Sequence, residues 1–96
     1  MVTHIVFFKL KEATPAKLAE AQGVLLGMDG KIAQLRHLEA GIDVIRSERS
    51  YDLALVTKFD SMADLQAYQV HPHHAGVVLP YMKEACSSVV AVDYEG

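Results

Sequence analysis

The feature that most constrains the fold is the first strand, Val2–Leu10, because both of its faces carry large apolar side chains. Side chains alternate between the two faces of a strand. One face carries His4, Val6 and Phe8, and the other carries Ile5 and Phe7. Leaving several such side chains in water costs on the order of 1.5–3 kcal/mol each. Both faces are therefore predicted to be covered.

The rest of the chain alternates helix and strand patterns. Thr14 and Ser61 are predicted N-caps, Gly41 marks a possible bulge, and Pro72 disfavours a helical His71. The predicted elements, in order, are a strand at Val2–Leu10, a helix from Pro15 to about Gly30, strands at Arg36–Arg46 and Tyr51–Phe59, a helix from Ser61 that breaks at His71, a helix at Ala75–Ala85 that Pro80 bends, and a strand at Ser88–Tyr94.

This β-α-β-β-α-β order is typical of the ferredoxin-like α+β fold, a four-stranded antiparallel sheet with helices on one face. Ninety-six residues make one domain, residues 1–96, with no room for a second domain, and its helices can cover only one face of the sheet. The uncovered sheet face and the 51% hydrophobic content then favour a homodimer with its two sheets face to face. Such a dimeric α/β barrel would leave an interior in which a ligand could lie.

Charge and composition exclude several classes of function. The net charge is −3 and no run of Lys or Arg occurs, which argues against nucleic acid. No apolar stretch reaches about 18 residues, so no membrane span is predicted. The N-terminus lacks the pattern of a signal peptide, and the single cysteine, Cys86, fits a reducing, cytoplasmic setting. We expect Cys86 to be a packed side chain rather than a nucleophile.

Three of the five histidines fall in the run His71-Pro72-His73-His74, shortly after Tyr68. Histidine moves protons near neutral pH and also binds metals. The run contains no carboxylate and no His-x-x-x-His spacing, and adjacent side chains rarely point at one ion. We therefore predict neither a metal nor a cofactor.

Each candidate residue has a functional and a structural interpretation. His74 is either a general base oriented by Tyr68 or a hydrogen-bonded residue that shapes the loop. Tyr68 is either its catalytic partner or a buried tyrosine with a paired hydroxyl. His4, with Val6 and Phe8, either lines the pocket or belongs to the core. His71 is a candidate ligand contact or a residue that holds the turn, and His73 is expected to be exposed.

The sequence resembles the stress-responsive dimeric A/B barrel (Dabb) family along nearly its whole length. The matching segments are His4-Ile5-Val6-Phe7-Phe8-Lys9-Leu10-Lys11, Gly41-Ile42-Asp43, Ser47-Glu48-Arg49-Ser50-Tyr51-Asp52-Leu53-Ala54-Leu55-Val56, Phe59-Asp60-Ser61, Leu65-Gln66-Ala67-Tyr68 and His71-Pro72-His73-His74. The resemblance implies a ferredoxin-like protomer and a homodimer that joins two sheets into a barrel.

The resemblance also implies candidate site residues. In a polyketide cyclase of the family, a tyrosine and the second histidine of a Tyr-x-x-His-Pro-x-His segment are catalytic, and they match Tyr68 and His74. Its first-strand histidine matches His4. The cyclase's glycine- and phenylalanine-rich stretch is replaced here by Ala75-Gly76-Val77-Val78-Leu79.

Three functions follow as alternatives. The first is a homodimer of unassigned activity, with a link to stress, that binds a small apolar molecule near Tyr68 and His74. The second is a cofactor-free enzyme, cyclase-like or monooxygenase-like, in which His74 takes a proton and Tyr68 steadies an oxyanion. The third is a purely structural stress protein whose interior is filled by its own side chains.

Overall fold

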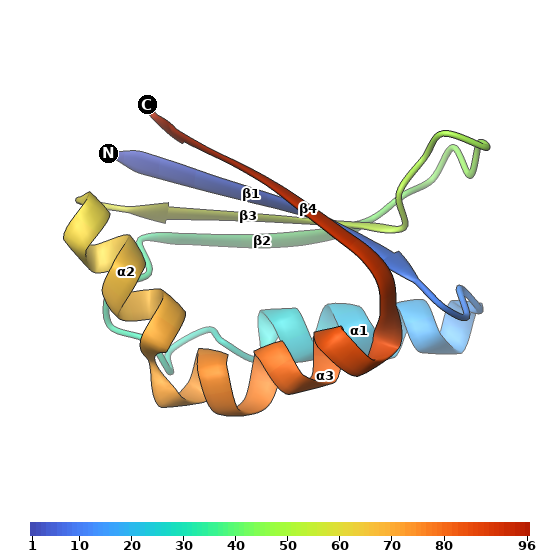
Figure 1. Ribbon diagram of the computed structural model, residues 1–96, viewed down its shortest axis with the longest axis horizontal. Coiled ribbons are helices and arrows are strands. Elements are labelled where there is room, and N and C mark those ends of the chain that lie inside the picture. The colour runs from blue at the N-terminus through green and yellow to red at the C-terminus, as the bar shows by residue number, and fades with distance from the viewer.

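A computed structural model describes residues 1–96 as one sheet backed by helices. The elements are β1 (Val2–Leu10), α1 (Pro15–Leu26), β2 (His37–Ile42), β3 (Leu53–Phe59), α2 (Met62–Val70), the π-helical segment η1 (His74–Val78), α3 (Leu79–Ala85) and β4 (Cys86–Glu95). The sheet is antiparallel with the order β2-β3-β1-β4. All helices lie on one side of it (Figure 1). The predicted ferredoxin-like α+β fold is confirmed.

Local sequence signals set where the helices begin and end. The Thr14 side chain accepts a hydrogen bond from the Lys17 backbone N–H, and Pro15 occupies the first turn of α1. The Ser61 hydroxyl caps α2 by accepting from the Asp64 backbone N–H. At His71 the backbone turns extended (φ −60°, ψ 138°), as the following proline requires.

The second strand and the first helix are shorter than predicted. The strand predicted at Arg36–Arg46 stops at Ile42, because the chain turns away and Arg46 adopts a positive φ of 58°. The predicted bulge at Gly41 is wrong, since Gly41 pairs regularly with Ala54. Helix α1 ends at Leu26, before the predicted end near Gly30, and leaves Met28 and Ile32 to pack from turns.

The helix predicted at Ala75–Ala85 is instead two segments, and Pro80 supplies the physical reason. A proline has no backbone N–H, so the Gly76 carbonyl loses its normal α-helical donor. The chain widens into the π-helical turn η1, in which the Leu79 N–H reaches back to the His74 carbonyl. This turn connects α2 to α3 beside the sheet.

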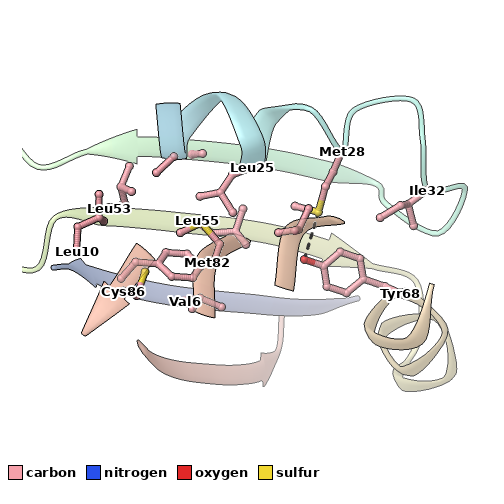
Figure 2. Close-up of a cluster of buried hydrophobic side chains, with 14 of the residues drawn as sticks. Val6, Leu10, Leu25, Met28, Ile32, Leu53, Leu55, Tyr68, Met82 and Cys86 are labelled. Atoms are coloured by element: carbon pink, nitrogen blue, oxygen red, sulfur yellow. Dashed lines mark hydrogen bonds between the residues drawn. The ribbon is translucent and has the colours of Figure 1, made fainter. Parts of the chain in front are cut away.

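The core lies between the sheet and the helices. Its fully buried side chains include Leu25, Met28, Phe59 and Tyr68, and Figure 2 shows several core residues meeting between β1, β3 and the helical layer. On the opposite sheet face Phe7 is 44% exposed and Val92 is 62% exposed. None of the helices combines the length and hydrophobicity that a membrane crossing requires.

Candidate functional site

A cleft of about 220 Å³ lies between the sheet and the helices, and it gathers most of the candidate residues. Ten of its thirteen lining residues are hydrophobic, and the exceptions are His4, Gln69 and His74. The lining consists of His4, Val6, Phe8, Leu25, Leu55, Tyr68, Gln69, His74, Val78, Leu79, Met82, Val89 and Ala91. No lysine or arginine is among them.

The cleft is on the helix side of the sheet. His4, Val6 and Phe8 point toward α2, η1 and α3, whereas Ile5 and Phe7 point to the bare face. The sequence favours a ligand cavity in the interior between two face-to-face sheets. The three candidate side chains His4, Tyr68 and His74 lie outside such an interior, because strand alternation turns His4 toward the helices.

Tyr68 forms an inner wall of the cleft and has no exposed surface. Its ring lies 4.4 Å from the His74 ring and 6.1 Å from the His4 ring, measured between centroids. Its hydroxyl donates to the sulfur of Met28 at 3.7 Å (Figure 2). Burial raises the pKa of the phenol far above its usual value, so Tyr68 stays neutral. Its catalytic role stays a prediction.

His74 is half-buried and has a defined tautomer. Its Nδ1 lies 3.0 Å from the Gln69 carbonyl oxygen, which can only accept. Nδ1 therefore carries the proton, and Nε2 holds a free lone pair. Desolvation by burial lowers the pKa of His74. The hydrogen bond to the Gln69 carbonyl opposes this change, and the charges of His4, His71 and His73 add smaller lowering contributions. A neutral imidazole at pH 7 is the form that a general base requires.

His4 is buried and paired with a carboxylate that sequence reasoning missed. Its Nδ1 donates to Oδ1 of Asp93 on the neighbouring strand β4, directly opposite in the register. The carboxylate fixes the orientation of the ring and keeps a proton on Nδ1. Only the pairing register of β1 with β4 places Asp93 here, and nothing local in the sequence reveals it.

The other two histidines of the run do not line the cleft. His71 Nδ1 accepts a hydrogen bond from the His73 backbone N–H at 3.1 Å, which holds the turn around Pro72. His73 is half-buried rather than exposed as expected. No three His, Cys, Asp or Glu side chains come together in a way that could hold a metal ion.

A helix-backed antiparallel sheet with one bare face and a helix-side cleft defines a ferredoxin-like α+β protein. The chain belongs to the stress responsive A/B barrel domain family, whose model matches residues 2–96. It is 26% identical over 95 residues to a stress-response A/B barrel domain-containing protein of Arabidopsis thaliana. That match covers 98% of this chain but only 36% of the Arabidopsis protein.

Solved structures share the whole fold. A dimeric ferredoxin-like protein of unknown function from Bacteroides fragilis is 28% identical, with a TM-score of 0.83 over 99% of this chain and 95% of that one. A similar dimeric protein from Thermobifida fusca is 26% identical, with a TM-score of 0.86 over 99% and 90%. The hydroxynitrile lyase of Passiflora edulis, at 18% identity and a TM-score of 0.82 over 97% and 90%, shares the fold alone.

Proposed function

We propose that the protein is a homodimer that binds a small, neutral, mostly apolar molecule in the helix-side cleft. The observation that carries the binding proposal is the pair of imidazoles in an apolar lining. His4 and His74 each engage Nδ1 within the protein and leave Nε2 without a protein partner. Two polar atoms in an otherwise apolar cleft are the usual means of orienting a small ligand.

The cleft supports a ligand of limited size and no negative charge. Its volume of about 220 Å³ is below the usual range for drug-sized ligands, about 300–1,000 Å³. No lysine or arginine in the lining could pair with a carboxylate or phosphate, and the Asp93 carboxylate bonded to His4 disfavours an anion. A neutral molecule with a carbonyl or hydroxyl group fits these properties.

The homodimer is supported by the bare sheet face and by two relatives. Phe7, Val90 and Val92 share that face, because Phe7 is opposite Val90 and Val92 is the next residue pointing the same way. The relatives from Bacteroides fragilis and Thermobifida fusca, each above 25% identity, are described as dimeric. Sedimentation showing a stable monomer at micromolar concentration would contradict this part of the proposal.

Binding is tested with indole, a compact neutral probe, by methyl NMR. We expect saturable shifts confined to cleft methyl groups, such as those of Val6, Leu55 and Met82, and none at Val92 on the bare face. Ala91→Phe, which fills the cleft from β4, should abolish the shifts, while Val90→Phe on the opposite face should keep them. Shifts spread over both faces, or unaffected by Ala91→Phe, would argue against the cleft as the binding site.

A second candidate function is cofactor-free proton transfer beside a carbonyl group, which the different partners of the two imidazoles favour. The Nδ1 of His74 is bonded to the Gln69 carbonyl, which leaves Nε2 as the basic nitrogen. The Nδ1 of His4 is bonded to the Asp93 carboxylate, which can balance the charge of a ring that also carries a proton on Nε2. In such an enzyme His74 Nε2 takes a proton from the carbon next to the carbonyl, and His4 Nε2–H stabilises the oxyanion that develops.

Hydrogen–deuterium exchange tests this enzyme hypothesis without a known product. Acetophenone in deuterated buffer, a neutral ketone of suitable size, should exchange its methyl protons faster with the protein than without it. We expect His74→Ala to reduce this rate by about 10²–10⁴-fold. His73→Ala should leave it unchanged, since His73 does not line the cleft. An undiminished rate in His74→Ala would rule out His74 as the base.

A further inference from the structure

The loop between β2 and β3, residues 43–52, presents two adjacent apolar side chains almost fully to solvent. Val44 is 87% exposed and Ile45 is 74% exposed, the first and third highest values among large hydrophobic residues. In Figure 1 this loop rises beyond the end of the sheet, on the side away from the helices. A single exposed hydrophobic residue is ordinary, but an adjacent pair at a projecting tip indicates a contact surface.

The loop is held in shape by a buried carboxylate. Asp52 Oδ2 accepts from the Leu10 backbone N–H at 2.7 Å, and Oδ1 accepts from Arg46 Nη2 at 2.8 Å. Asp43 Oδ2 accepts from the Arg46 backbone N–H at 2.6 Å. These bonds hold Arg46 at its φ of 58°, a conformation that residues other than glycine rarely adopt. The apolar tip is therefore presented in a preformed arrangement.

At the base of the loop a hollow of about 410 Å³ opens on the bare sheet face. On that face it is lined by Phe7, Tyr51 and Ala54, together with the charged residues Asp43 and Arg49. The rings of Phe7 and Tyr51 lie 6.4 Å apart and join the sheet to the loop. The hollow is thus continuous with the face that the proposed homodimer covers.

The two-fold axis of the homodimer decides which end of a second copy meets this hollow. In the order β2-β3-β1-β4 every neighbour is antiparallel, so the two edge strands, β2 and β4, run in opposite directions. A two-fold axis along the strands preserves strand direction and brings β2 of one copy antiparallel to β4 of the other. The projecting loops of both copies then lie at the same end of the barrel, and so do the hollows at their bases.

We propose that residues 43–52 form an arm that contacts the second copy of the chain. Val44 and Ile45 of the arm pack into the hollow beside Phe7 and Tyr51 of that second copy. This inference rests on the proposed homodimer. It adds that the β2–β3 loop, and not only the flat sheet, supplies the contact. The interface is isologous, so each change in the arm acts twice per dimer.

Sedimentation equilibrium of Val44→Ser/Ile45→Ser tests the arm. We expect the dimer dissociation constant to rise at least about tenfold. The matched control is Met62→Ser/Val70→Ser, which removes two exposed apolar side chains from α2 on the helical layer and should change the constant by less than about twofold. A wild-type monomer would overturn the homodimer and the arm together. A wild-type dimer that the arm variant leaves unchanged would overturn the arm alone.

Cross-linking supplies a second measurement that does not depend on affinity. A photoreactive phenylalanine analogue at position 45 is placed in an equal mixture of ¹⁴N- and ¹⁵N-labelled chains. We expect cross-linked peptides of mixed isotopic content that join the loop to the segments around Phe7 or Tyr51. Cross-links found only within one isotope would overturn the proposal.

Discussion

The two faces of β1 differ in what covers them. Helices of the same chain cover one face, and no element of the chain covers the other. His4, Val6 and Phe8 are buried against the helices, whereas Phe7, between two of them in sequence, is 44% exposed. Both faces are apolar, and each also carries polar side chains with partners inside the protein, such as His4 with Asp93 on the helix face and Thr3 with the Gly96 carbonyl on the bare face. The bare face carries apolar side chains that lack any covering layer.

Because of this difference, the stability of the folded chain and the association of two chains depend on different faces of the sheet. A chain of this size has one helical layer, and the connections of a ferredoxin-like fold place that layer on a single face. Changes on the helix face should therefore act on folding and on the cleft. Changes on the bare face should act mainly on the association of two chains.

The largest expected effect is on folding and uses two neighbours on β3. Leu55 faces the core and is 2% exposed, while Val56 is half-buried on the bare face. Leu55→Ala should reduce the free energy of unfolding by about 2–5 kcal/mol, because it leaves a cavity. Val56→Ala should cost roughly 1 kcal/mol or less in dilute monomer. Urea unfolding at submicromolar concentration measures both, and equal costs would contradict the distinction between the faces.

The next effect is on association. Phe7→Ser should weaken the dimer by roughly 30-fold, about 2 kcal/mol, because a central aromatic side chain at an interface is a frequent hot spot. Leu26→Ser, at an equally exposed position on the helical layer, is the control and should leave association unchanged. Sedimentation velocity over a dilution series gives both constants. If the two variants dissociate alike, the bare face has no special role.

A smaller effect concerns pH and His74. Desolvation lowers the pKa of folded His74 below 6.5, so the unfolded chain binds its proton more readily. This contribution to stability is complete above about pH 6.5 and is lost as the pH falls toward the folded pKa. Between pH 7.5 and 5.5 the wild type should lose more stability than His74→Gln, measured by urea unfolding. An identical loss in His74→Gln would contradict the burial argument.

The smallest effect is expected from the Tyr68 hydroxyl. Its acceptor is the weakly accepting sulfur of Met28. Tyr68→Phe should therefore change the free energy of unfolding by at most about 1 kcal/mol and indole affinity by less than about twofold. Calorimetry measures both quantities. A tenfold loss of binding, or of ketone exchange, would instead assign the hydroxyl a direct role in the site.

Local signals predicted most of the fold. Alternation located β1 and β3, hydroxyl caps at Thr14 and Ser61 started two helices, and Pro72 ended α2. The errors fall where a distant partner decides the backbone. The strand after Arg36 stops early because Asp52 holds Arg46 out of strand geometry, and that contact depends on folding.

The candidate site was only partly predictable. A tyrosine and histidines near one another in sequence indicated Tyr68 and His74, and strand alternation put His4 with Val6 and Phe8. Which side of the sheet they face depends on where the helices pack. The partners that set the two tautomers, Gln69 and Asp93, are a backbone carbonyl and a residue 89 positions from His4, and neither has a sequence signature.

The amino-acid sequence alone was enough to predict the order of strands and helices and the need to cover two apolar faces, because both depend on local periodicity and composition. The family followed from the resemblance of its motifs to those of known members. Two features became visible only in the folded chain: the candidate histidines lie on the helix side of the sheet, and a projecting apolar loop lies at one end of the bare face. Those outcomes depend on strand register and on buried contacts between residues far apart in the chain, such as Asp52 with Leu10 and Asp93 with His4.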